Sequence, residues 1–315
     1  MIRTVILGAE TAEAGELIRI LAMHPDVEIV GAQSYGNEGV ALTSLHHGLI
    51  GETSQLCTVH PNPERCDMIL DFSADGLPEL TTSLLGRFPD AKVIRLARTD
   101  KAYADAGNFV YALPEINRKA LVRGASAARI PRPLASTALV ALYPLASHLL
   151  LPNADITLHF DVPAAIADIT DVAAVEKEIG EILRGVQMSW NASVTVTLSP
   201  SNTRRSITMS TDIPMQIELE IVAGTFEMYD DHHFAFGITT AVGPSEVAGT
   251  EKCVVSLSRP EGDNLHIEAV ADARMRGGAG EAVHVLNLLA GLHERTGLAL
   301  KAIDFLPLPS NSNPD

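Results

Sequence analysis

The turn Pro131-Arg132-Pro133 joins a predicted apolar strand over residues 125–130 to a predicted apolar helix from Ser136 to Leu151. Where a strand of a parallel sheet gives way to a helix, the positive helix N-terminus can activate a nucleophile or bind an anion. This turn has no nucleophile, because the side chain of Pro133 offers neither a proton nor a lone pair. Arg132 is the residue there that could meet a ligand.

A second turn, at residues 8–15, has part of the glycine pattern of a nucleotide-binding loop. A dinucleotide fingerprint needs glycine where the backbone approaches the pyrophosphate. Gly8 fits, but Thr11 stands at the close-approach position, between Glu10 and Glu13, whose carboxylates repel a diphosphate. Two interpretations stay open, a nucleotide site and a capped structural turn.

The next predicted strand ends at Gln33-Ser34, without the acidic residue that binds a free ribose 2′-hydroxyl. Any dinucleotide bound beside Ser34 would therefore be the phosphorylated form.

Arginines end two further predicted strands, and in a doubly wound sheet those ends border one crevice. They could form an anion site, or carboxylates nearby could pair with them in a filled crevice. The arginines are Arg95, Arg98, Arg129 and Arg132, and the acids are Glu10, Glu13, Asp71, Asp75 and Asp100.

Other candidate groups have simpler interpretations. The segment 229–233, YDDHH, has metal-ligand residue types, but adjacent histidines rarely chelate together, so a solvated loop is favoured. The pair His46-His47 is a loop candidate for catalysis, and His284 is expected on a helix surface. The cysteines have no evident activating partner; they are Cys57, Cys66 and Cys253.

The elements that position these residues alternate between strand and helix in the first part of the chain, which predicts a doubly wound parallel sheet. After the helix at 136–151, longer alternating strands predict a second α/β part with a mixed sheet. The predicted strands are 4–7, 27–33, 66–72, 91–97, 125–130, 155–162, 192–199, 205–213, 253–258 and 264–270; the helices are 13–23, 136–151, 172–186, 215–229 and 281–292.

Length and composition limit the number of domains, the classes of binding partner and the cellular location. The 315 residues suffice for two domains, and the formal charge of −16 disfavours nucleic acid and anionic membranes as partners. Three cysteines without ligand spacing indicate neither a disulfide framework nor a zinc site. No apolar run is long enough for a membrane span. We expect a cytoplasmic protein.

Four stretches together resemble the N-acetyl-gamma-glutamyl-phosphate reductase family, which is related to aspartate-semialdehyde dehydrogenase. They are residues 7–30, LHHGLIGET at 45–53, YALPEINR at 111–118 and RGGAGEAVHVLNLLAGLHERTGL at 276–298. The resemblance implies a Rossmann-type domain over residues 1–133 and an inserted α/β domain over 134–275. The C-terminal helix over 276–306 is expected to return to the first domain, and the polar, proline-bearing tail at 307–315 is expected to be disordered. A homo-oligomer formed through the inserted sheet is implied as well.

The resemblance also shows what this chain lacks. The family is expected to form a thioester on a cysteine, to transfer a hydride from NADPH and to use a histidine as acid and base. The cysteine position is Pro133 and the histidine position is Ser199. The asparagine expected after Asp272 is Ala273. The family's serine-x-aspartate is replaced by residues 97–99, and its glycine-rich substrate loop by the short segment 162–166.

Without a thiolate no thioester forms, so we expect a catalytically degenerate member with an assembly or regulatory role, alone or with an active relative. A working NADP-dependent reductase of arginine biosynthesis and an anion-binding sensor remain as alternatives. We expect no cofactor and no metal; if the family site is retained, NADP would contact Gly8, Thr11, Ser34 and Gly277. Substrate or another small anion would contact Arg98, Glu115, Arg132 or Arg205.

Overall fold

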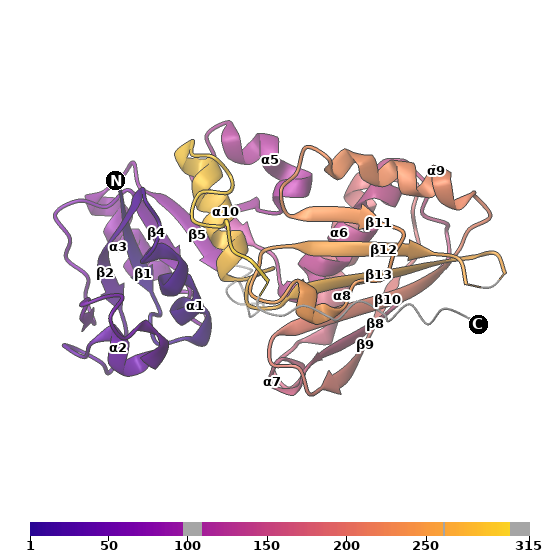
Figure 1. Ribbon diagram of the computed structural model, residues 1–315. Coiled ribbons are helices and arrows are strands. Elements are labelled where there is room, and N and C mark those ends of the chain that lie inside the picture. The colour runs from indigo at the N-terminus through magenta and orange to yellow at the C-terminus, as the bar shows by residue number, and fades with distance from the viewer. Residues whose placement is uncertain (97–108, 261, 303–315) are drawn as a thin grey trace.

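The protein contains two sheets with separate hydrophobic cores, as predicted (Figure 1). The computed structural model describes residues 1–96, 109–260 and 262–302. In the first sheet the strand order is β3-β2-β1-β4-β5-β7-β6 and all pairings are parallel. Its strands are β1 (Ile2–Leu7), β2 (Val27–Gln33), β3 (Cys57–Thr58), β4 (Met68–Asp71), β5 (Lys92–Leu96), β6 (Val110–Tyr111) and β7 (Ala127–Ile130).

Helices cover this sheet because parallel strands are apolar on both faces. Helix α1 carries an apolar stripe of Leu17, Ile18 and Leu21, which enters the same core as β1 and β4. The helices of this part are α1 (Ala12–Leu21), α2 (Leu42–Leu45), α3 (Pro78–Arg87) and α5 (Pro114–Val122), with a 3-10 turn η1 (His47–Leu49).

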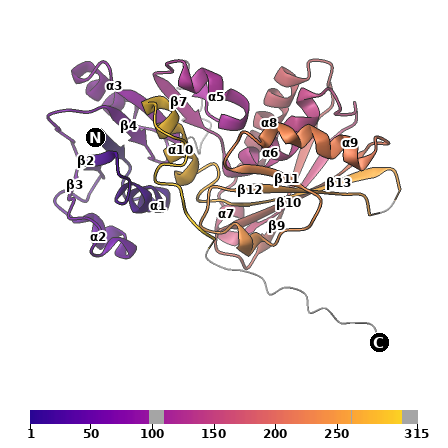
Figure 2. The same ribbon diagram turned by 45° about the horizontal axis from the view of Figure 1, so that its top comes forward.

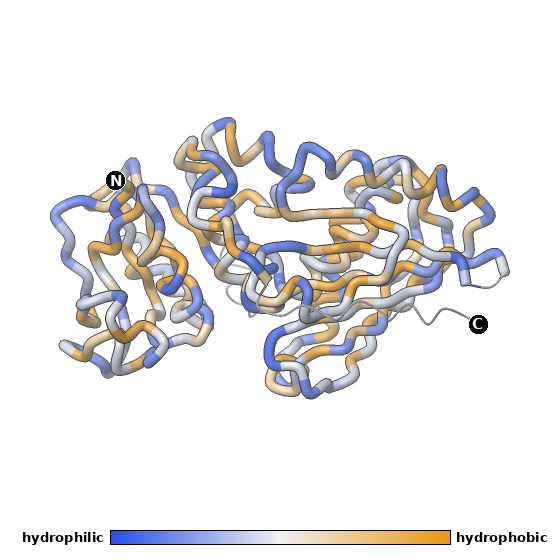
Figure 3. Tube along the Cα trace, in the orientation of Figure 1, coloured by the Kyte–Doolittle hydropathy of each residue, from blue (hydrophilic) through white to orange (hydrophobic). Residues whose placement is uncertain are grey.

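The second sheet is mixed, with the order β11-β12-β13-β10-β8-β9. Apolar and polar residues alternate along its strands (Figure 3), so one face is buried and the other is open. Its strands are β8 (Ile156–Pro163), β9 (Val194–Ser201), β10 (Ser206–Pro214), β11 (Ala235–Ile238), β12 (Cys253–Ser258) and β13 (Asn264–Asp272). The other elements here are α6 (Pro133–Ser147), α7 (Ala164–Ala167), α8 (Val172–Val186), α9 (Leu219–Gly224), η2 (Thr225–Tyr229) and η3 (Pro244–Glu246).

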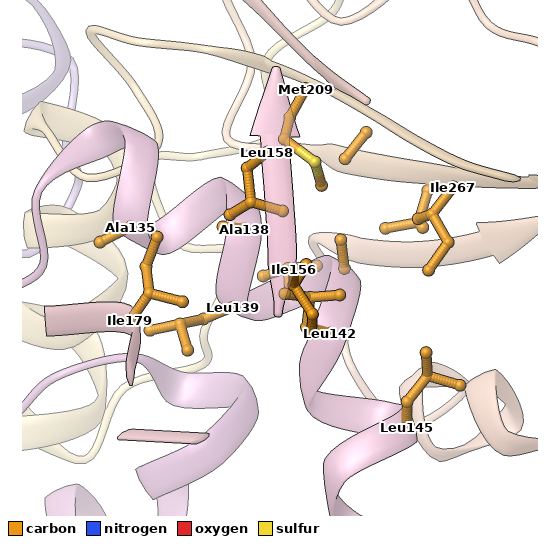
Figure 4. Packing of buried hydrophobic residues seen from close by; sticks show 14 of the residues in the cluster. Ala135, Ala138, Leu139, Leu142, Leu145, Ile156, Leu158, Ile179, Met209 and Ile267 are labelled. Atoms are coloured by element: carbon orange, nitrogen blue, oxygen red, sulfur yellow. The ribbon is translucent and has the colours of Figure 1, made fainter. Parts of the chain in front are cut away.

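Helix α6 is the centre of the second core. Almost all of its residues are buried, and it packs between α8 and the inner face of the sheet. Figure 4 shows Leu139 beside Ile179 of α8, and Leu142 beside Ile156 of β8. Because such a helix is apolar all round, its first turn is held in place by the packing of the whole helix.

Helix α10 (Ala279–Ala290) follows the second sheet in sequence but belongs to the first core. It packs against α1 and lies between the two parts of the molecule in both Figure 1 and Figure 2. Within the described residues the chain therefore leaves the first part after β7 and returns to it after β13.

Of the five predicted helices only 172–186 has the predicted bounds; α1 and α10 are shifted by one or two residues, and two others differ more. Helix α6 begins at Pro133 rather than Ser136, because proline is well suited to the first position of a helix, and it ends at Ser147 rather than Leu151. Leu149 has a φ of 60°, which is incompatible with continuing the helix.

The helix predicted at 215–229 begins only at Leu219 and turns into the 3-10 segment η2. The reason is a guanidinium: Arg259 donates hydrogen bonds to the carbonyls of Met215 and Ile217, which holds this entry segment in non-helical form.

The predictions for residues 97–99 and for the tail at 307–315 lie outside the described residues. Among the described residues, no helix combines the length and the apolar character needed to cross a bilayer.

Candidate functional site

A cavity of about 310 Å³ lies at the boundary of the two parts, beside the turn that begins α6. It is enclosed by the start of α1, the end of β5, the first turn of α6, the segment from the end of β8 to α8, and the loop after β13. The described lining residues are Ala12, Glu13, Leu96, Arg132, Pro133, Leu134, Pro163, Ala165, Ile166, Ile169, Thr170, Asp171, Val175, Arg204, Ala273, Arg274 and Gly277.

The α6 turn presents a proline ring and backbone to this cavity. Arg132 is the N-cap residue in an extended conformation, and Pro133 is the first helical residue. The backbone of Gly277 packs directly on Pro133, since a Cβ at residue 277 would lie 2.4 Å from the Pro133 Cα. Gly277 also has a φ of +62°, so a side chain there is excluded both by space and by conformation. At this turn there is no nucleophilic side-chain atom.

Arg132 lines the cavity but is committed to a buried ion pair. Its Nη1 lies 2.9 Å from Glu178 Oε2 on α8, and its backbone N–H donates to Glu178 Oε1. The Tyr111 hydroxyl donates a further hydrogen bond to Glu178 Oε1, at 2.9 Å. With both oxygens of Glu178 engaged, this pair fixes α6 against α8.

The turn after β1 is filled by its own side chains. Thr11 Oγ1 accepts the N–H of Ala14 at 3.2 Å, which makes Thr11 the N-cap of α1, and it lies 3.1 Å from the Gly8 carbonyl and 3.3 Å from that of Phe72. Gly8 has a φ of +73°, and a Cβ there would lie 2.5 Å from the backbone of Ser73. Glu13 in the first helical turn faces the cavity. Because the N–H of Ala14 donates to Thr11 Oγ1, one of the backbone donors that a pyrophosphate would need at this helix end is already occupied.

Ser34 and His46, two further candidate residues, have local structural partners. Ser34 is fully buried and its hydroxyl accepts a hydrogen bond from Asn37 Nδ2 at 2.7 Å. His46 Nε2 lies 2.7 Å from the Ala9 carbonyl, so this histidine packs behind the loop rather than in the cavity.

Two further arginines near strand ends, Arg95 and Arg205, form ion pairs. Arg95 Nε lies 3.1 Å from Asp71 Oδ2 with both groups buried, as expected for a filled crevice. Arg205 forms ion pairs with Asp272 and, at 3.0 Å, with Glu16 of α1. Burial raises the pKa of Glu16, but hydrogen bonding and the charges of Arg19 and Arg205 lower it overall. Arg98 lies outside the described residues.

Ser199 is exposed on the edge strand β9, where it is paired in register with Asp161. It is not one of the cavity-lining residues. Ala273, by contrast, does line the cavity, directly after the buried Asp272.

Beneath the α6 turn lies a buried charge cluster formed by Arg276, Glu115, Glu251 and Glu281. Arg276 is fully buried, with Nη2 at 2.7 Å from Glu115, Nη1 at 3.3 Å from Glu251 and Nε at 3.8 Å from Glu281. Ser136 of α6 joins the cluster, because its Oγ lies 3.0 Å from Arg276 Nε and 2.9 Å from Glu281 Oε2. Glu115 is therefore a buried ion-pair residue, not a group that reaches a ligand.

One guanidinium cannot neutralise three carboxylates, so the acids differ in protonation. Burial raises the pKa of Glu281 to about 7, and it raises the pKa of Glu251 well above its ordinary value. Burial also opposes the ionisation of Glu115, but the charge of Arg276 lowers its pKa overall. The Glu115–Arg276 pair is charged, while Glu251 and Glu281 hold protons more readily.

His284 was expected on a helix surface, and this is wrong: it is 1% exposed, and its Nε2 lies 2.8 Å from Glu294. Arg118 of α5 contacts the same carboxylate at 2.5 Å. Burial alone would raise the pKa of Glu294, yet these two partners lower it to about 2. The group joins α5, α10 and the segment after α10.

The three cysteines are all buried, away from the α6 turn. Burial raises the pKa of each thiol, to about 11 for Cys66 and about 12 for Cys253. Such thiols are weak nucleophiles at neutral pH. Across the described parts of the chain, histidine, cysteine and carboxylate side chains form no cluster that could bind a metal ion.

Sequence reasoning missed Arg276 and Glu251 as members of the cluster. A signal existed, because Glu281 and His284 interrupt a helix that is otherwise apolar on all sides, and charges on such a helix must have buried partners. The partners themselves come from α5, α6 and residue 251, which the sequence of the helix cannot specify.

No family model matches the chain. Its solved neighbours include aspartate semialdehyde dehydrogenase II from Vibrio cholerae, with a TM-score of 0.67 at 15% identity over 92% of this chain and 98% of that one. Aspartate semialdehyde dehydrogenase with NADP from Candida albicans has a TM-score of 0.65 at 14% identity, over 92% and 98% of the two chains. At these identities the similarity establishes the fold.

Curated relatives are more similar in sequence. N-acetyl-gamma-glutamyl-phosphate reductase of Phocaeicola vulgatus is 30% identical over 328 residues, which cover 97% of this chain and all of the relative. The proteins of that name from Parabacteroides distasonis and Flavobacterium johnsoniae are 30% and 31% identical over the same share of both chains. Together with the two-sheet fold and the position of the α6 turn, this end-to-end similarity shows that the chain belongs to the N-acetyl-gamma-glutamyl-phosphate reductase family.

Proposed function

We propose that this protein does not catalyse the reductase reaction and that it has an assembly or regulatory role. The observation that carries the proposal is Pro133 at the start of α6, with the backbone of Gly277 packed on it. A covalent intermediate needs a side-chain nucleophile at this place. The only thiols of the chain are buried elsewhere and have raised pKa values, so none can substitute.

We also propose that NADP does not bind. Thr11 supports this, since its side chain caps α1 where a pyrophosphate would approach, and Glu13 adds negative charge at the same helix end. Ser34, the residue nearest the expected 2′-phosphate, is buried and bonded to Asn37. These residues do not fit a dinucleotide diphosphate.

A working reductase remains the main alternative. It would have to transfer hydride to an acyl phosphate without a covalent intermediate, which demands cofactor and substrate held in line. Two observations speak against such an in-line arrangement of cofactor and substrate. Ser199 is exposed and does not line the cavity, and Ala273, which does line it, has an apolar side chain. The sensor alternative loses two of its strand-end arginines, because Arg95 and Arg132 are engaged in buried ion pairs.

The open face of the second sheet supports the assembly role (Figure 1). Its outward side chains are largely hydroxyl, histidine and carboxyl groups, and the described helices α6 and α8 pack on the opposite face. We propose that this face joins two copies of the chain, or one copy and an active relative, in the cytoplasm. Outward residues include Thr157, His159, Asp161, Thr195, Thr197, Thr208, Ser210, His266 and Glu268.

The test is a reductase assay in the oxidative direction, with N-acetylglutamate semialdehyde, phosphate and NADP. We expect no NADPH formation by the purified protein, under conditions in which the Phocaeicola vulgatus relative is assayed in parallel. Turnover by this chain would overturn the proposal. Calorimetric titration with NADPH separately tests the cofactor site, and sedimentation with and without an active relative tests assembly.

A further inference from the structure

The cavity at the α6 turn is lined mainly by hydrocarbon. Leu134 and Val175 form its floor from the second core, and Ile166 and Ile169 form a wall on the segment that includes α7. Pro133 adds its ring instead of a reactive group. Such a lining disfavours a polar ligand that would leave its hydrogen bonds unmade, and favours an apolar one.

Two arginines give this apolar cavity a charge preference. Arg204 and Arg274 line it, and within residues 1–96, 109–260 and 262–302 the side chain of neither has an ion pair or a hydrogen bond. They differ in this from Arg132, which is held by Glu178. Two guanidinium groups without partners, beside an apolar wall, form a receptor for an oxyanion.

An acidic residue of the cavity limits the charge of that anion. Asp171 also lines it, and its Oδ1 accepts a hydrogen bond from the N–H of Ala174 as the N-cap of α8. With Arg204 and Arg274, this carboxylate leaves a local charge that a monoanion balances, whereas a dianionic phosphate would exceed it. A single carboxylate fits better than a phosphate monoester.

The volume of the cavity, about 310 Å³, lies at the lower end of the range of roughly 300–1,000 Å³ that is typical of small-molecule sites. A medium-chain fatty acid and a phenylalkanoic acid are small apolar acids of the class that such sites take.

We propose that the cavity binds a small apolar monocarboxylate, with its hydrocarbon part between Leu134 and Ile166 and its carboxylate on Arg204 and Arg274. Such binding goes beyond the absence of catalysis proposed above, because a ligand can occupy the cavity whether or not the protein reduces an acyl phosphate. It would give a regulatory protein a specific signal to detect.

The experiment is calorimetric titration of the full chain with octanoate. We expect one site per chain, binding at least about tenfold weaker for the neutral isostere octanamide because the arginines lose their charged partner, and no binding of acetate. N-acetylglutamate and inorganic phosphate are titrated in parallel, and both should bind more weakly than octanoate.

Variants locate the site. The double variant Arg204→Gln, Arg274→Gln should weaken octanoate about tenfold while leaving octanamide unchanged, and Arg65→Gln, an exposed arginine outside the cavity, is its control. Ile169→Asp should lower the affinity for both octanoate and octanamide. Because Ile169 is 69% exposed, the folded state tolerates the charge. Ile221→Asp, at a residue of α9 that is 61% exposed, is the matched control. Melting temperatures check folding throughout.

Several outcomes would overturn the proposal: no heat from octanoate, equal affinity for octanamide, an unchanged affinity in the arginine double variant, or tighter binding of N-acetylglutamate. None of these outcomes depends on the reductase assay. The binding proposal and the proposal that the protein is not catalytic can therefore be overturned independently.

Discussion

The two sides of the α6 turn differ in their chemistry. On the cavity side, Pro133, Ala273 and Gly277 present no group that can attack, donate or accept a proton. On the inner side, Ser136 of the same helix enters a fully buried cluster of one arginine and three glutamates. On the inner side charge is gathered into one buried cluster, whereas on the cavity side the charged residues lie around a proline that carries no reactive group. The comparison teaches that a turn without a reactive side chain can rest on an ionic interior.

Removing the charge of Arg276, at the centre of the buried charge cluster, tests this contrast most strongly. Arg276→Met leaves three buried carboxylates without their cation, and breaking a buried pair in this way costs about 3–5 kcal/mol. We expect that loss in the free energy of unfolding measured with urea. Arg65→Met, at an exposed position, is the control; if both variants lose the same small amount, the cluster does not support the turn.

The protonation of the cluster gives a prediction in pH. The pKa of Glu281 is about 7 in the folded state against an ordinary 4.5, so its contribution to stability is complete below pH 4.5 and is lost as the pH rises through 7. The difference corresponds to a few kcal/mol, on the order of 3. Glu281→Gln should flatten the decline in stability between these pH values, whereas Glu52→Gln, at an exposed site, should leave the slope intact. Because Glu251 titrates in the same cluster, part of the slope should remain.

On the cavity side, Pro133→Cys asks whether the turn still suits a thiol. A cysteine at the first position of α6 has its thiolate stabilised by the helix N-terminus. Its alkylation by iodoacetamide at neutral pH should exceed that of the native chain, whose thiols are buried, by about tenfold or more. We expect no reductase activity from this variant, since Ser199 and Ala273 are unchanged. A native rate equal to that of the variant would show that the cavity does not admit the reagent.

The smallest effect concerns the loop after β1. Thr11→Ala removes the N-cap of α1, which typically costs ~1 kcal/mol, and Thr11→Gly should cost less at a cap position. Thermal unfolding of the two variants measures this order. If Thr11→Gly also creates affinity for NADPH, Thr11 is the principal obstacle to the cofactor; without such affinity, Glu13 and the filled Ser34 position also exclude it.

The sequence predicted the architecture well, because alternating apolar strands and helices report directly on which faces are buried. It located the α6 turn between β7 and α6, and it indicated paired charges at Asp71 and Arg95. The resemblance to the family was also confirmed by the end-to-end relatives.

Other features could not be read from the chain. The residues around Arg276 come from α5, α6 and the loop before β12, so their meeting depends on tertiary packing. His284 was placed on the surface because helical spacing shows a stripe but not the second element that covers it. The cavity is likewise formed by segments from both parts of the molecule. That Arg204 and Arg274 have no ion-pair partner among the described residues, while Arg132 has one, depends on tertiary packing.

The contact between Pro133 and Gly277 has a mechanical consequence. Each residue lies where the described chain crosses from one part of the molecule to the other, after β7 and after β13. The two covalent crossings therefore touch at one point. The ion pair between Arg205 and Glu16 and the hydrogen bond from the Tyr111 hydroxyl to Glu178 span the same boundary. The crossings and these polar contacts together tie the two parts of the molecule at the edge of the cavity.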